Sequence, residues 1–144
     1  MKISSLPLSA LAFALAACGS QSSAPPAEQP TATPTPAPLP TEIPAAFQGR
    51  WGLTEKDCTS GKGDAKGLLT VEPTSLNFYE STGKLDQITE AEEGRVRGNF
   101  SFKGEGMEWK RDEILTLRKD GKVLVRREFG DDASPEPFDY TKCE

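Results

Sequence analysis

After residue 46, apolar residues occur in short runs that alternate with polar ones, and Gly, Asp or Pro separates one run from the next. A repeat of two is typical of β-strands. We expect strands at 49–54, 67–72, 75–80, 84–89, 95–103, 107–112, 114–118, 123–128 and 138–143, of which 107–112 and 114–118 could be one strand. No run of eleven residues has a helical period, although a short helical turn is compatible with residues 86–93. The pattern predicts an antiparallel β meander over residues 47–144.

Two short segments have the composition of hairpin turns. Residues 81–84 read Ser81-Thr82-Gly83-Lys84, and residues 119–122 read Lys-Asp-Gly-Lys. Glycine adopts positive φ without strain, and Asp-Gly is frequent in hairpins. We therefore expect a hairpin loop at each place.

The alternation also predicts which side chains face the core. Val96, Phe100 and Phe102 alternate with polar residues in the strand expected at 95–103, so they should share one buried face. The other expected core residues are Trp51, Leu69, Val71, Leu76, Phe78, Trp109, Leu115, Leu117, Val123 and Val125.

The first 17 residues differ from the rest of the chain. Lys2 precedes an apolar run from Leu6 to Ala17 that is shorter than the roughly 20 residues of a membrane-spanning helix. This pattern is typical of a secretory signal peptide. Leu15-Ala16-Ala17-Cys18 resembles the lipobox of bacterial lipoproteins, which implies cleavage before Cys18, a diacylglyceryl group on its sulfur and acylation of the new amine. An ordinary secretory signal with a chance cysteine and an N-terminal membrane helix are the alternatives.

The residues after Cys18 bear on its location. Gly19 and Ser20 follow, with no aspartate at the second position. In the lipoprotein family this implies passage to the outer membrane, facing the periplasm, rather than retention in the inner membrane. Two or more acyl chains would anchor the protein stably, whereas one binds membranes only marginally.

Residues 18–46 have the composition of a tether. The stretch contains eight of the twelve prolines in the chain, with Ala and Thr abundant among the others. Such a segment cannot bury a core and favours extended polyproline II, at roughly 3.1 Å per residue. It would span up to about 85 Å when fully extended. We expect a disordered spacer, with a ligand for a proline-recognising domain as the alternative.

The three cysteines then predict the architecture. If lipid occupies Cys18, then Cys58 and Cys143 are the only intramolecular pair in an oxidising compartment. A disulfide needs Cα atoms within about 7 Å, so the two ends of the meander must meet. We therefore expect an all-β fold, a small closed or nearly closed barrel of about eight strands.

Charge and composition limit the chemistry. Residues 47–144 carry 16 Lys and Arg against 20 Asp and Glu, interspersed, which argues against nucleic acid as a partner. Histidine is absent, so Ser-His and Cys-His nucleophiles are excluded and zinc lacks its usual ligands. The acidic runs at 90–93 and 131–132 lack the spacing of a calcium loop. We expect no cofactor, no metal and no enzymatic activity, although a paired-carboxylate hydrolase is formally open.

A short motif suggests a family. Gly49-Arg50-Trp51 at the start of the first expected strand resembles lipocalins and other calycin barrels, in which the Trp closes one barrel end. Residues 45–53, with Cys58 soon after, are similar to bacterial metalloprotease inhibitors of the Inh type. That resemblance implies an eight-stranded barrel that inserts the segment before its first strand, here 39–46, into a protease. The second cysteine of that family follows the first by a few tens of residues, whereas here the partner is Cys143. The alternative is that Gly49-Arg50-Trp51 serves only to pack the barrel interior.

These observations lead to two classes of function. The first is a binding module that inhibits a protease or a lysozyme, with Trp51, Ser81, Thr82 and Gly83 as candidate contacts and 81–84 as an inserting loop. The second is a structural role in which the barrel contacts peptidoglycan or another envelope protein. Carriage of an apolar ligand inside the barrel is disfavoured, because small barrels are normally filled with side chains.

Overall fold

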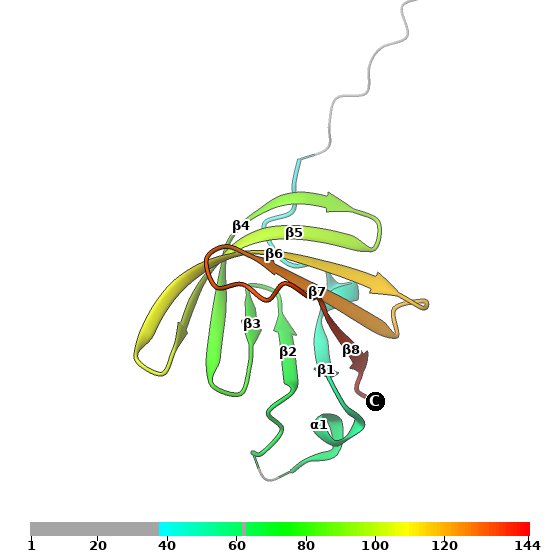
Figure 1. Cartoon of the computed structure of the whole chain (residues 1–144). Coiled ribbons are helices and arrows are strands. Elements are labelled where there is room, and N and C mark those ends of the chain that lie inside the picture. Colours follow the sequence, from blue (N-terminus) through cyan, green and yellow to red (C-terminus); the bar gives the residue numbers. More distant parts are fainter. Residues whose placement is uncertain (1–37, 62) are drawn as a thin grey trace, which may run out of the picture. The chain divides into compact units, whose positions relative to one another are not determined.

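The computed structural model describes residues 38–61 and 63–144. The expected signal peptide (1–17), Cys18 and most of the expected tether lie outside the described residues. The chain forms β1 (Gly49–Gly52), β2 (Leu68–Glu72), β3 (Ser75–Asn77), β4 (Ser81–Glu92), β5 (Arg95–Gly104), β6 (Met107–Arg118), β7 (Val123–Phe129) and β8 (Phe138–Lys142). A 3-10 helix η1 (Ala45–Phe47) precedes β1, and a short helix α1 (Glu55–Thr59) follows it (Figure 1). In this part of the chain, neither helix has the length and apolarity that crossing a membrane requires.

The eight strands form one closed barrel. Each strand pairs antiparallel with the next in sequence. The ring closes where β1 pairs with β8, with Trp51 opposite Lys142 and Gly52 opposite Thr141. The predicted all-β class and closed antiparallel meander are therefore confirmed.

The bounds of the middle strands differ from those expected. Residues 107–118 form the single strand β6, the option that the sequence left open. The helical turn considered at 86–93 is not formed, because those residues continue β4 and pair with β5 as far as Glu92. Register shifts between Leu85 and Gln87, and between Ile88 and Glu90, mark bulges that break the simple alternation of β4.

The prediction of a hairpin loop at 81–84 is wrong, whereas the turn at 119–122 is confirmed. Ser81 is already the first residue of β4. The turn lies three residues earlier, at 78–81, where the Phe78 amide donates to the Ser81 carbonyl. Gly83 is needed for close packing instead: a Cβ there would come within 2.6 Å of the Phe102 ring. At 119–122 the expected positive φ is present, and the Lys122 amide donates to the Lys119 carbonyl.

The interior of the barrel is mostly apolar. The expected alternation in β5 is confirmed, since Val96, Phe100 and Phe102 are all buried. In β7 the predicted core residues are partly wrong: Leu124, which was not predicted, belongs to the interior cluster, and Val123 is only half-buried. Val125 is buried as expected, at 7% exposure, but it is not part of that cluster. The core consists of Ile43, Phe47, Trp51, Leu69, Val71, Leu76, Leu85, Ile88, Val96, Phe100, Phe102, Leu115, Leu124 and Tyr140, with Phe78, Trp109, Leu117 and Phe138 packed against it.

The segment before β1 fills one end of the barrel. Ile43 and Phe47 are both buried in the core. The Ile43 amide donates to the Pro73 carbonyl over 2.7 Å, and Trp51 Nε1 donates to the Phe47 carbonyl over 2.8 Å. The folded unit thus includes residues whose composition predicts a tether, because Ile43 covers the apolar end of the barrel.

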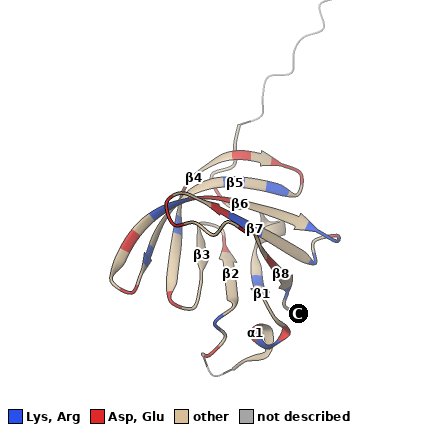
Figure 2. Cartoon of the chain, viewed as in Figure 1, with Lys and Arg blue, Asp and Glu red and all other residues tan. Residues whose placement is uncertain are grey.

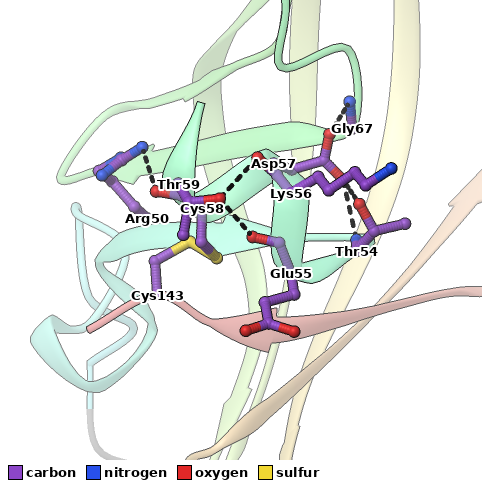
Figure 3. Close-up of a disulfide and its surroundings, with 9 residues drawn as sticks. All are labelled: Arg50, Thr54, Glu55, Lys56, Asp57, Cys58, Thr59, Gly67 and Cys143. Carbon is purple, nitrogen blue, oxygen red and sulfur yellow. Dashed lines mark hydrogen bonds between the residues drawn. A yellow bond between two sulfur atoms is a disulfide. The ribbon is translucent and has the colours of Figure 1, made fainter. Parts of the chain in front are cut away.

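A disulfide joins the two ends of the barrel sequence, as expected. Cys58 on α1 bonds to Cys143, with their Cα atoms 5.2 Å apart (Figure 3). The helix carrying Cys58 was not predicted, because five residues are too few to show a period. Thr54 and Asp57 form a capping box at its start, and Asp57 also accepts the Gly67 amide (Figure 3). The Thr54 hydroxyl contributes most to lowering the pKa of Asp57.

Candidate functional site

The two ends of the barrel are built differently. Ile43, Phe47 and the buried Trp51 fill the end at which β1 begins. Because the strands alternate in direction, the other end is bordered by residues 53–67, 78–81, 104–107 and 129–138. A cavity of about 380 Å³ lies at this second end, lined by Lys66, Phe78, Tyr79, Glu80, Ser81, Phe102, Trp109, Arg111, Arg126 and Glu128. We call it the mouth cavity.

One wall of the mouth cavity is aromatic. Phe102 on β5 lies directly opposite Trp109 on β6, and their rings stack with centroids 5.4 Å apart and planes 13° apart. Phe78 lies 6.0 Å from Phe102 on the other side. The missing side chain of Gly83 leaves room for the Phe102 ring beside β4. Three rings thus form a continuous apolar surface.

The floor of the mouth cavity is a buried ion pair. Arg126 donates from Nε and Nη2 to the two carboxylate oxygens of Glu113, over 3.0 and 2.9 Å. Only 1% of Glu113 and 6% of Arg126 is exposed. The guanidinium also lies 4.7 Å from the Phe78 ring centroid and 5.1 Å from that of Phe138. The two rings therefore add to the acidic partner in holding the arginine in place.

Glu128 connects this floor to the loop between β7 and β8. One of its oxygens pairs with Arg126. The other accepts the Ser134 amide over 2.8 Å. The loop is therefore fixed to the same buried guanidinium that supports the cavity.

Burial controls the protonation of the floor. Loss of water raises the pKa of Glu113 to about 7, although the attraction of Arg126 opposes the rise. Burial also raises the pKa of Tyr140, which lies beside the pair. For Arg126 desolvation is the largest influence and acts to lower the pKa, but Glu113, Tyr140 and Glu128 together outweigh it and raise the pKa.

Two cations at the mouth have most of their donors unused. The Arg111 side chain donates one hydrogen bond to another described residue, the Lys110 carbonyl, over 3.2 Å. The Lys66 ammonium lies 5.7 Å from the Tyr79 ring centroid. Within residues 38–61 and 63–144, neither side chain has an acidic partner within 4.0 Å.

The four candidate contact residues from the sequence do not form one site. Ser81 lines the mouth cavity. Thr82 is exposed, and Gly83 is buried against Phe102. Trp51 is 0% exposed at the filled end, where its indole N–H is bonded to the Phe47 carbonyl, so it offers no surface to a ligand. Cys18 lies outside the described residues.

The remaining charged groups are distributed over the barrel. Figure 2 shows blue and red segments interspersed along the strands. Glu90, from the acidic run at 90–93, forms ion pairs with Arg95 and Arg97 over 2.7 and 3.0 Å. No cluster of three or more potential metal ligands among His, Cys, Asp and Glu occurs in the described ranges.

The fold and site define a small closed antiparallel β-barrel with one filled end and one hollow end. No family model, no curated protein and no solved structure matches the chain.

Proposed function

We propose that this protein is a binding module that holds its partner at the mouth cavity and does not catalyse a reaction. The observation that carries the proposal is the difference between the two ends: the protein fills one with its own side chains and leaves the other hollow. The cavity, of about 380 Å³, lies within the range typical of ligand pockets. Its lining combines an aromatic wall with a few oriented polar groups, as such pockets do.

Paired variants test this site. Trp109→Ala removes part of the aromatic wall, whereas Arg118→Ala changes the other end of the same strand. Material captured from periplasmic extract by the natural protein should be lost with Trp109→Ala and kept with Arg118→Ala. Equal capture by both variants, with both folded by circular dichroism, would contradict the mouth cavity as the site.

We also propose that the module is a lipoprotein of the outer membrane that faces the periplasm. The resemblance of residues 15–18 to a lipobox and the proline-rich composition of the following stretch support this. Mass spectrometry of protein from its native host should show a polypeptide that begins at Cys18 and carries added acyl mass. The Cys18→Ser variant should lack that mass. An intact leader in the natural protein would contradict lipid anchoring.

Inhibition of a protease or lysozyme is the more specific form of this proposal. Residues 38–42 are exposed, with Leu39 at 47%, and they precede the firmly packed Ile43. Within the described part of the chain before β1, an inserting segment is therefore limited to 38–42, because moving Ile43 or Phe47 would open the core. Replacing residues 38–42 with Gly and Ser should abolish inhibition in a panel of metalloproteases and leave the melting temperature unchanged. A purely envelope-binding protein should instead co-sediment with peptidoglycan whether or not this segment is intact.

A further inference from the structure

The hydrogen-bonding groups of the mouth cavity are unequally used. Both oxygens of Glu113 accept from Arg126. Those of Glu128 accept from Arg126 and from the Ser134 amide. Glu80, on the exposed turn, is the third carboxylate near the cavity. The buried acceptors are therefore already committed, and a cationic guest would find little to bind at the floor.

The donors are in the opposite state. A guanidinium has five N–H groups and an ammonium has three. Among the described residues, Arg111 uses one of its five on the Lys110 carbonyl, and the Lys66 ammonium lies over the ring of Tyr79 without an acidic partner. A guest that satisfies this cavity must therefore bring acceptors, and an ionised acid such as a carboxylate forms strong, charge-assisted hydrogen bonds with a guanidinium.

The strand geometry places Arg111 beside the aromatic wall. Arg111 and Trp109 are two positions apart on β6, on the same face, so their Cα atoms are roughly 7 Å apart. Across the sheet, Arg111 pairs with Phe100 and Trp109 with Phe102. One compact guest can therefore touch the rings and the guanidinium together.

We propose that the mouth cavity takes a guest that carries an acidic group next to a flat apolar group. Arg111 and Lys66 bind the acid, and Trp109, stacked on Phe102, contacts the flat part. Arg126 has a positioning role: it is held by Glu113 and Glu128 and supports the floor. This inference rests on the proposed binding function and adds the chemical class of the guest.

Two dyes that differ in one acidic group test the inference. The mature chain, with Cys18→Ser to keep it in solution, is titrated with 8-anilinonaphthalene-1-sulfonate and with its neutral relative N-phenyl-1-naphthylamine. We expect the sulfonate dye to bind at least about tenfold more tightly, because a charge-assisted contact contributes more than a neutral one. Added salt should lower the affinity for the sulfonate dye and leave the affinity for the neutral dye unchanged.

Matched variants identify the residues. Arg111→Gln should lower the affinity for the sulfonate dye about tenfold and change that for the neutral dye less than twofold. Arg118→Gln, which removes the same charge at the other end of β6, should change neither. Trp109→Ala should weaken both dyes. Unchanged circular dichroism and melting temperature establish that each variant is folded.

The outcomes separate this inference from the proposed function. Equal binding of the two dyes, with no effect of Arg111→Gln, overturns the acidic guest while leaving the cavity as a binding site. Binding of neither dye, or binding that Trp109→Ala does not weaken, overturns the mouth cavity itself. Displacement of the sulfonate dye by 2-naphthoate supports a free organic acid as the source. Displacement by a peptide that ends in tryptophan, but not by its amide, supports the carboxylate end of a protein chain.

Discussion

Arg126 and Glu113 show how a charged pair is accommodated inside a barrel of this size. A buried charge without a partner costs several kcal/mol, and a bidentate contact offsets much of that cost. The sequence Val123-Leu-Val-Arg-Arg-Glu-Phe129 gives little sign of this arrangement, since either set of alternate residues could face inward. Apolarity alone favours the set that contains Val123 and Val125 as the inward-facing residues. The correct face depends on Glu113 lying on the neighbouring strand, which only the register of β6 against β7 reveals.

Glu113 makes stability depend on pH. Its pKa is about 7 in the folded protein and 4.5 in the reference state, so the folded state binds the proton more tightly. Protonation of Glu113 therefore contributes about 3 kcal/mol to the free energy of unfolding. This contribution is fully present below pH 4.5 and is lost as the pH rises through 7. The charged and titratable groups around it are Arg111 on β6, Arg126 and Glu128 on β7 and Tyr140 on β8.

Urea unfolding at pH 5 and pH 8 measures this effect. The free energy of unfolding should be lower at pH 8, and Glu113→Gln should remove most of the difference because glutamine does not titrate. The exposed Glu108 provides the control, since Glu108→Gln should leave the difference in unfolding free energy between pH 5 and pH 8 unchanged. A natural protein that becomes more stable between pH 5 and pH 8 would contradict the shift.

At the scale of elements, the strands were predicted better than their ends. The alternation of β5 is regular over ten residues, so its inward face was identified from the sequence. In β4 the bulges after Leu85 and Ile88 disrupt the repeat, and the sequence around Gly83 has the composition of a turn. Local composition does not distinguish a glycine in a turn from a glycine that makes room for a neighbouring ring. The role of Gly83 depends on Phe102, which is nearly twenty residues away in the sequence.

Gly83→Ala should destabilise the protein. Its Cβ would lie 2.6 Å from the Phe102 ring, which must move out of its stack with Trp109. Overpacking of this kind costs about 1–3 kcal/mol. Thermal unfolding should show a lower melting temperature for Gly83→Ala than for Thr82→Ala, the exposed neighbour on β4. Equal melting temperatures for Gly83→Ala and Thr82→Ala would contradict the close approach of the Phe102 ring to Gly83.

At the scale of the whole molecule, the cysteine spacing carried most of the information. Cys58 and Cys143 lie 85 positions apart, and requiring them to meet predicts closure without any knowledge of side-chain packing. The hollow end was not predictable in this way. It arises from where individual side chains stop filling the interior, and Arg111, Arg126 and Glu113 were not recognised as lining or supporting a cavity.

Reduction of the disulfide should destabilise the closed barrel. On the chain-entropy model a loop of this length contributes about 4.5 kcal/mol. The melting temperature should therefore fall when reductant is added, and it should fall equally in the double variant Cys58→Ser, Cys143→Ser without reductant. Reductant should have no effect on that variant. Alkylation of the natural protein without reductant should find neither thiol free.

The disulfide also determines how the barrel responds to mechanical tension. The chain enters at the filled end and runs along β1, so a pull on Pro38 loads the bonds of β1 to β2 and β8 in shear, all at once rather than one by one. If β1 slides free, the covalent link at Cys58, six residues beyond its end, stops further extraction and transmits the load directly to the chain beside β8. The remaining seven strands lie between the two linked residues, so the load is divided between the chain that leads into β2 and the chain that leaves β8. A pull on a partner held at the hollow end is therefore shared by two strands instead of being carried by β2 alone.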